Sequence, residues 1–101
     1  MALDFAILAE TGEPAETISL EPDPHYEMMM LAKELKLQKL LSFSDYYADV
    51  DLSAAKLPAL AREISRLEEI VPPELREFTT GFKALIGLAI AKRKPLCAIP
   101  D

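Results

Sequence analysis

Two stretches of apolar residues at helical spacing, separated by Pro72 and Pro73, place the strongest constraint on the fold of this chain. Before the prolines, an apolar side chain recurs every three or four residues, as on the buried face of a helix, at Leu57, Leu60, Ala61, Ile64, Leu67 and Val71. The same spacing returns at Leu75, Phe78, Phe82, Leu85, Ile86 and Ala89. Because a proline cannot join a helix interior, the pattern predicts two separate helices, one beginning near Leu57 after a Ser53 cap and one ending near Lys94.

The first 20 residues have a different period. Leu3, Phe5 and Ile7 alternate with Asp4 and Ala6, as in a half-buried strand, and a second alternation runs from 16 to 20. Gly12 can supply the positive φ of a tight connection, and Pro14 marks where the second strand can begin. The pattern predicts a β-hairpin.

A further helix is expected after the hairpin. Asp23 followed by Pro24 is a helix start signal, and an inward stripe follows at Met28, Leu31, Ala32 and Leu35. The phase of the apolar residues changes after Lys36, so we expect the helix to end or bend near this residue and an irregular buried segment to lead into residues 44–51.

The C-terminal residues LCAIP, bounded by prolines, are typical of a short terminal strand that could pair beside the first one. Gly81 and Gly87 lie inside the last helix and would permit close approach of a neighbouring element. A chain of 101 residues, half of them hydrophobic, is about the size of one domain. The sequence therefore predicts a single α+β domain over 1–101, with an N-terminal β-hairpin, three helices on one face and a C-terminal strand completing a small antiparallel sheet.

The charge is unevenly distributed. The net charge is -6, and residues 1–32 contain seven acidic residues and no Lys or Arg. An acidic surface repels nucleic-acid phosphates and anionic lipid, so we expect neither as a partner and favour a basic protein instead. No apolar run approaches the roughly 18 residues of a membrane span, and the N-terminus lacks the basic region of a secretory signal. A cytoplasmic location is the expectation, and the single cysteine is compatible with it.

Most enzyme chemistry lacks the residues it needs. His25 is the only histidine and is expected as a partly exposed residue in the first turn of a helix. Cys97 is expected as a small buried hydrophobe, and Lys92, Arg93 and Lys94 as cations at a helix end rather than a phosphate site. No phosphate-binding glycine motif is present. We predict no enzymatic activity and no cofactor; an enzyme using His25 or Cys97 with a carboxylate is the weaker alternative.

The segment SFSDYYADVDLS, residues 42–53, has the most distinctive composition. Calcium binding of the EF-hand type is excluded, because Ala54 stands where the loop needs glycine and Leu60 where it needs glutamate. A solvated loop and a less ordinary Mg or Ca site remain alternatives. Tyrosines among carboxylates are typical of protein interfaces, and we expect both rings to be available at the surface. The predicted partner-binding residues are Asp45, Tyr46, Tyr47, Asp49, Asp51, Glu13 and Glu16, with no metal site.

The adjacent tyrosines set among acids resemble the recognition surface of the nuclease-colicin immunity proteins, small acidic bacterial proteins that cover a basic toxin domain. The resemblance covers about a tenth of the chain, at Tyr46, Tyr47 and the neighbouring aspartates, and the helical-bundle fold of those proteins differs from the one predicted here. It implies a non-enzymatic immunity or antitoxin-like protein that neutralises a cationic toxin. The alternative is a homodimer or larger homo-oligomer with a structural or regulatory role, formed through Tyr26, Met30 and Leu37 or through a sheet edge.

Overall fold

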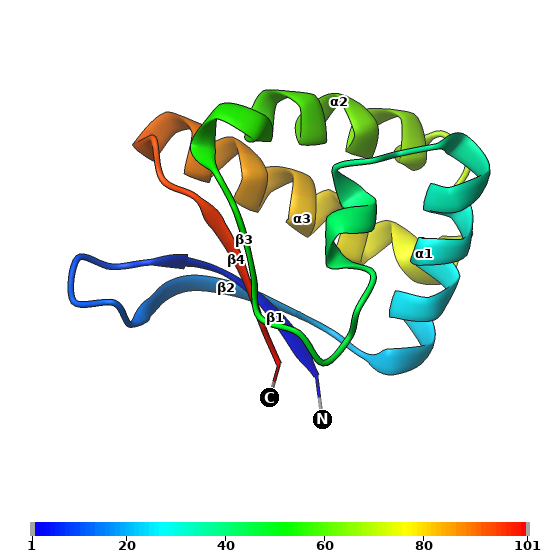
Figure 1. Ribbon diagram of the computed structural model, residues 1–101. Helices are drawn as coiled ribbons and strands as arrows, with labels where there is room; N and C mark the ends of the chain where they lie inside the picture. Colours follow the sequence, from blue (N-terminus) through cyan, green and yellow to red (C-terminus); the bar gives the residue numbers. More distant parts are fainter. Residues whose placement is uncertain (1, 101) are drawn as a thin grey trace.

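The computed structural model describes residues 2–100 and has the α+β architecture that the sequence predicts. Two of the three helices lie over one side of a four-stranded antiparallel sheet, and the first helix stands beside it (Figure 1). Two short 3-10 turns, η1 (Leu40–Phe43) and η2 (Ala54–Lys56), lie in the connections. The regular elements are β1 (Leu3–Leu8), β2 (Pro14–Leu20), α1 (Pro22–Leu35), β3 (Val50–Leu52), α2 (Leu57–Glu68), α3 (Pro73–Lys92) and β4 (Leu96–Pro100).

The strand order is β2-β1-β4-β3. The predicted hairpin is present, with Gly12 at a φ of 88° in the connection and β2 beginning at Pro14. The predicted pairing of the C-terminal strand beside β1 is also confirmed. The sequence did not predict β3, which pairs with β4 at the other edge of the sheet. Three residues flanked by loop-forming aspartates are too few for an alternating pattern to be recognised.

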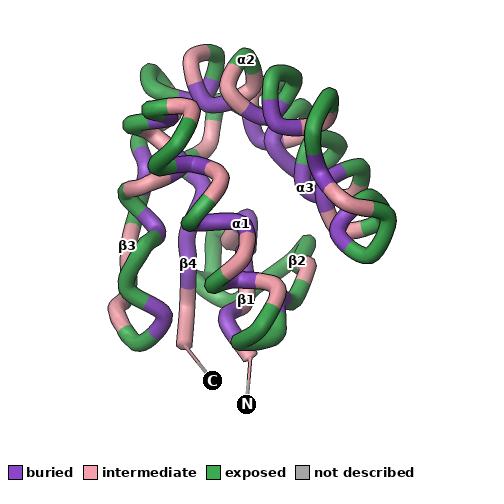
Figure 2. The backbone as a smooth tube through the Cα atoms, turned by 90° about the vertical axis from the view of Figure 1, so that its right-hand side faces the viewer, coloured by how far each residue is buried: buried purple, intermediate pink, exposed green. Residues whose placement is uncertain are grey.

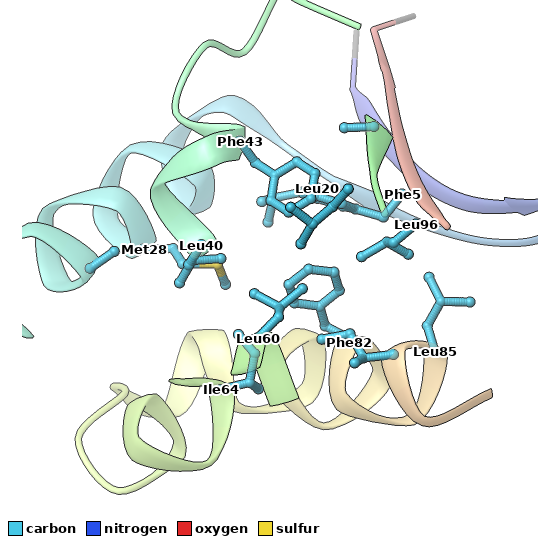
Figure 3. Close-up of a cluster of buried hydrophobic side chains, with 14 of the residues drawn as sticks. Phe5, Leu20, Met28, Leu40, Phe43, Leu60, Ile64, Phe82, Leu85 and Leu96 are labelled. Carbon is cyan, nitrogen blue, oxygen red and sulfur yellow. The ribbon is translucent and has the colours of Figure 1, made fainter. Parts of the chain in front are cut away.

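The core lies between the sheet and the helices (Figure 3). Cross-strand partners share a face, so the register places Leu3 and Phe5 of β1 on the same side as Leu20 of β2 and Ala98 of β4. All four are buried, and the Phe5 ring contacts those of Phe43, Phe78 and Phe82 at centroid distances of 5.2, 6.0 and 4.6 Å. The hydrophobic cluster thus joins β1 to η1 and to α3.

The helix boundaries agree with the sequence except in detail. α1 begins at Pro22 rather than after an Asp23 cap, and Asp23 lies within its first turn. It ends at Leu35, as predicted for the region of Lys36, and Lys36 itself has a left-handed φ of 57°. α2 begins at Leu57 as expected, but the Ser53 side chain makes no capping hydrogen bond. α3 ends at Lys92, slightly before the predicted residue, because Arg93 adopts a left-handed φ of 58°.

The irregular segment after α1 is held by Glu63 of α2. The Glu63 carboxylate accepts hydrogen bonds from the backbone N–H groups of Lys39 and Leu40, at 3.1 and 2.9 Å. These amides lie at the start of η1, where backbone donors have no partner within the turn itself. Leu37 and Leu40 are buried beneath this connection, as the sequence predicted for the segment as a whole.

The two glycines of α3 are expected to respond differently to alanine. Gly87→Ala should raise the free energy of unfolding by about 1 kcal/mol, the difference in helix propensity, because an added Cβ would meet nothing within 4 Å. Gly81→Ala should raise the free energy of unfolding by less, because the added Cβ would lie 2.7 Å from the Ile18 Cδ1 atom. Adding Ile18→Val, which removes that atom, should enlarge the gain from Gly81→Ala. Urea denaturation tests this, and equal gains at both glycines would contradict the close approach of β2 to α3.

Candidate functional site

The acidic tyrosine loop, residues 44–51, runs from η1 into β3 at one edge of the sheet. In Figure 1 it is the green chain that passes below η1 and turns upward into β3. Both of its ends are fixed, one by the buried Phe43 of η1 and the other by pairing of β3 with β4. The loop is therefore a surface feature attached to ordered structure at each end.

Tyr46 is buried, with 8% of its surface exposed. Its hydroxyl donates a hydrogen bond to the Leu20 carbonyl oxygen at 2.9 Å. The sequence-based expectation that both tyrosine rings are available at the surface is therefore wrong for Tyr46. A tyrosine can be buried in this way because its ring packs with apolar groups while a backbone acceptor satisfies its hydroxyl.

His25 is also buried, which corrects the expectation of a partly exposed residue in the first turn. Its Nε2 atom lies 2.8 Å from the Phe43 carbonyl oxygen, and because a carbonyl only accepts, Nε2–H is the donor. The imidazole also meets the Tyr46 ring edge-on, at 4.9 Å between centroids. His25 thus connects α1 to η1 and packs against Tyr46 of the tyrosine loop.

Tyr47 has the opposite environment from Tyr46, with 70% of its surface exposed. Its ring stands nearly perpendicular to that of Tyr46, at 87° and 5.5 Å between centroids. The Asp45 Oδ1 atom accepts a hydrogen bond from the Tyr47 backbone N–H at 2.9 Å, a local turn that aspartate often forms. Tyr46 thus attaches the loop to the core, and Tyr47 projects into solvent beside it.

The three aspartates of the loop, Asp45, Asp49 and Asp51, are exposed. Within residues 2–100, the ion pair in the structure joins Lys83 to Glu68, and no lysine or arginine neutralises the loop. In the same part of the chain, no group of three or more His, Cys, Asp and Glu side chains is arranged to hold a metal ion. The loop therefore presents uncompensated negative charge around Tyr47.

Glu13 and Glu16 are exposed, but they lie away from the loop. Glu16 belongs to β2 and Glu13 to the hairpin connection, whereas the loop leads into β3 at the opposite sheet edge. With β1 and β4 between them, the two edge strands are about 14 Å apart at the usual strand spacing. The structure thus divides the predicted binding residues into two acidic regions, one at each edge of the sheet.

Cys97 is buried beside Asp51, its partner in the β3–β4 register, as the sequence predicted for a small hydrophobe. Burial, a hydrogen bond with Asp51 and the negative charge of that carboxylate raise the pKa of the thiol to about 11. A reactive cysteine has the opposite environment, one that stabilises the thiolate.

The raised pKa of Cys97 predicts slow alkylation. In the unfolded chain the thiol has its ordinary pKa, near 9.0, whereas in the folded protein burial and Asp51 raise its pKa to about 11. Iodoacetamide at pH 9 should therefore label the native protein far more slowly than the protein in urea, and the free energy of unfolding should fall as the pH rises through this window. Asp51→Asn should lower the thiol pKa and speed native labelling several-fold. Unchanged labelling in this variant would contradict the effect of Asp51.

The proposed self-association residues, on α1 and just after it, differ in burial as the two tyrosines do. Tyr26 and Met30 are exposed, at 69% and 43%, and their spacing of four residues puts them on one face of the helix. Leu37 is buried and cannot contribute to that surface, which corrects its inclusion. Met28 and Met29 also pack inward.

Within residues 2–100, no helix combines the length and hydrophobicity needed to cross a membrane. Comparisons of the chain with protein-family models, curated proteins and solved structures give no significant match.

Proposed function

We propose that this protein is a non-enzymatic binding protein that uses the acidic tyrosine loop to engage a cationic protein, in the manner of an immunity or antitoxin protein that covers a basic toxin domain. The observation that carries the proposal is the projection of Tyr47 from a fixed base, surrounded by uncompensated carboxylates. Of the two tyrosines in the segment that resembles the colicin immunity proteins, Tyr47 is the one that a partner can reach.

The preorganisation of Tyr47 supports this role. A side chain already held in place loses less conformational entropy on binding, which increases affinity. The Tyr47 backbone N–H is hydrogen-bonded to the Asp45 carboxylate, and the Tyr47 ring contacts the Tyr46 ring. Tyr46 is in turn hydrogen-bonded to the Leu20 carbonyl oxygen and packed against the His25 ring. Tyrosine is one of the residue types that most often carry interface binding energy.

The surrounding charges support a cationic partner. Exposed aspartates can form charge-assisted hydrogen bonds with Lys or Arg, and they accelerate encounter between oppositely charged surfaces. Because exposed charges are screened within about 8 Å at physiological ionic strength, association should slow as salt is added. The net charge of -6 adds to this attraction at long range.

An affinity capture from source-cell extract at low and at high salt tests the proposal. The full chain serves as bait beside a variant with Asp45, Asp49 and Asp51 changed to Asn. A matched control changes Glu27, Glu34 and Glu69 to Gln, so that both variants lose the same charge. We expect a basic protein to be retained by the wild type and the control at low salt, to be released at high salt, and to be lost from the Asn variant. Equal retention by all three baits would exclude the loop as the binding surface.

A homo-oligomer is the second candidate, favoured by the exposed pair Tyr26 and Met30 on α1. Sedimentation at micromolar concentration separates it from the first. A dimer that Tyr26→Ala dissociates would support self-association through α1, and a monomer would exclude it at that concentration.

A further inference from the structure

A groove runs between β2 and α3 at the sheet edge farthest from the tyrosine loop. It consists of two hollows of about 320 and 440 Å³ that share Ile18 and Gly81. The first is lined by Glu16, Thr17, Ile18, Gly81, Ala84, Leu85 and Leu88, and the second by Ile18, Ser19, Glu74, Glu77, Phe78 and Gly81. The lining residues of α3 recur at helical spacing, so they form a stripe along one side of the helix.

One wall of the groove is the outer strand of the sheet. β2 pairs with β1 on one side and has no strand on the other within the described chain, and Figure 2 shows it at the margin of the sheet. It is the longest strand, and from 14 to 19 every residue except the half-buried Ile18 is exposed. An edge strand leaves alternate backbone N–H and C=O groups directed outward, where another chain can pair with them.

This edge lacks the features that commonly protect such strands. Lysine, proline and bulges discourage pairing of an edge with another chain. In β2, the proline and the register shift lie at the start of the strand, at Pro14 opposite Leu8. The residues that follow, 16–20, contain neither lysine nor proline. This unprotected part of the strand is the part that borders the groove.

The helix side of the groove has an apolar floor. Gly81 lets Ile18 pack so closely on α3 that a Cβ at this position would lie 2.7 Å from its Cδ1 atom. Phe78 and Leu88 are half-buried on either side of this contact, and Ala84 is exposed between them. Side chains of an added strand that point toward α3 would meet this floor, and those on alternate residues would point away.

The rim of the groove carries one sign of charge. Glu16, Glu74 and Glu77 line it, and no Lys or Arg is among these described lining residues. Such a rim favours a ligand with Lys or Arg side chains. It disfavours a second copy of this chain, because pairing β2 with β2 would bring Glu16 and its acidic neighbours toward the same residues of the other copy.

We propose that the β2–α3 groove binds an extended basic segment of a partner protein by strand addition. The segment pairs its backbone with the outer edge of β2 and turns one row of alternate side chains toward α3. The middle of this row is apolar and lies over Ile18, Phe78 and Leu88, and Lys or Arg at its two ends lie near Glu16 and near Glu74 and Glu77. Main-chain pairing gives affinity in this mode of recognition, and the alternating side chains give specificity. The site is separate from Tyr47 and does not depend on the function proposed above.

The test uses the 101-residue chain and a fluorescein-labelled, terminally blocked peptide of sequence Lys-Thr-Val-Thr-Val-Thr-Lys-Thr, whose valines and lysines share one row of alternate side chains. One control peptide replaces each lysine with glutamate, which reverses the charge. A second replaces each valine with proline, which removes the N–H groups needed for strand pairing. We expect binding of the Val–Lys peptide alone, with amide chemical-shift changes centred on β2 and on residues 74–88 of α3.

Two variants test the helix side of the groove. Glu74→Gln with Glu77→Gln should weaken binding about three- to tenfold at low salt, as expected for exposed charge pairs. Its control, Glu34→Gln with Glu69→Gln, removes the same charge from exposed positions elsewhere and should bind like the wild type. Ala84→Lys should weaken binding more than tenfold with the thermal midpoint unchanged, whereas Ala55→Lys, another exposed alanine, should have no effect.

Three results would overturn the proposal. The first is absence of binding, or equal binding of the glutamate or proline peptide. The second is shift changes confined to residues 44–51, which would place the cationic ligand on the tyrosine loop and leave the proposed function standing. The third is a dimer in sedimentation that forms through β2, which would make a second copy the occupant. Retention of the captured partner by the variant with Asp45, Asp49 and Asp51 changed to Asn, with peptide binding at the groove intact, would count against the function proposed for the loop and not against this site.

Discussion

Replacing Phe5 with alanine is expected to lower the free energy of unfolding by about 3 to 5 kcal/mol, the usual cost of removing a buried phenylalanine ring. Phe5 is fully buried in the central part of β1, and its ring contacts aromatic rings from η1 and from α3. The substitution would therefore leave a cavity where the sheet, the irregular segment and the longest helix meet. Against a total of about 5 to 15 kcal/mol for a typical domain, the loss should leave little or no native protein at 37 °C.

Urea denaturation followed by circular dichroism measures this effect. Phe78→Ala is the matched control, because Phe78 belongs to the same aromatic cluster but is only half-buried. Its cost should be clearly smaller, since the groove beside it is open to solvent and the side chain has less surface to lose from the core. Equal costs for the two substitutions, or a loss below about 1 kcal/mol at Phe5, would contradict the core described here.

Replacing Tyr47 with alanine is expected to weaken binding of the cationic partner by about 2 kcal/mol or more, which is roughly 30-fold or more in the dissociation constant. The reason is its position: the ring projects from a base fixed by Asp45 and Tyr46, so it is presented to a partner at low entropic cost. Because 70% of Tyr47 is already exposed, its removal should change the thermal midpoint little.

Tyr26→Ala is a closely matched control for Tyr47→Ala. Tyr26 has 69% of its surface exposed, against 70% for Tyr47, but it lies on α1 outside the loop. Isothermal titration calorimetry with the captured partner compares the two directly. A strong effect at Tyr47 and none at Tyr26 supports the loop, whereas the reverse would move the interface to α1 and favour the surface considered for self-association.

The sequence predicted those elements whose hydrophobic pattern and whose boundary residues, proline or glycine, indicate the same structure. The hairpin and α2 combine a clear period with a proline or glycine at a boundary, and the C-terminal strand is a short apolar run between two prolines. β3 was missed because three residues cannot establish a period, and its formation depends on pairing with Leu96–Ala98, far along the chain. The start of α1 was misplaced because Pro22 and Pro24 are both compatible with the first turn of a helix.

The site could be predicted only in part. Composition identified the acidic tyrosine segment, but nothing local distinguishes Tyr46 from Tyr47. Their different burial arises from contacts with Leu20 and His25, which lie more than 20 residues away in the sequence. His25 was misjudged for the same reason, because its partner is the carbonyl group of Phe43. The apolar groove on α3 did leave a signal, since Gly81, Ala84 and Leu88 form a second small or apolar stripe beside the core-facing one.

We expect the aspartates of the tyrosine loop to serve binding and not to be needed for folding. A variant with Asp45, Asp49 and Asp51 changed to Lys is the most direct test of this expectation. These side chains are exposed, and no cation of the described chain neutralises them, so the reversal removes no ion pair from the fold. We predict a thermal midpoint within about 3 °C of the wild type together with a loss of partner affinity of at least 100-fold at low salt. Parallel loss of folding and binding, or full affinity in the reversed variant, would contradict the account.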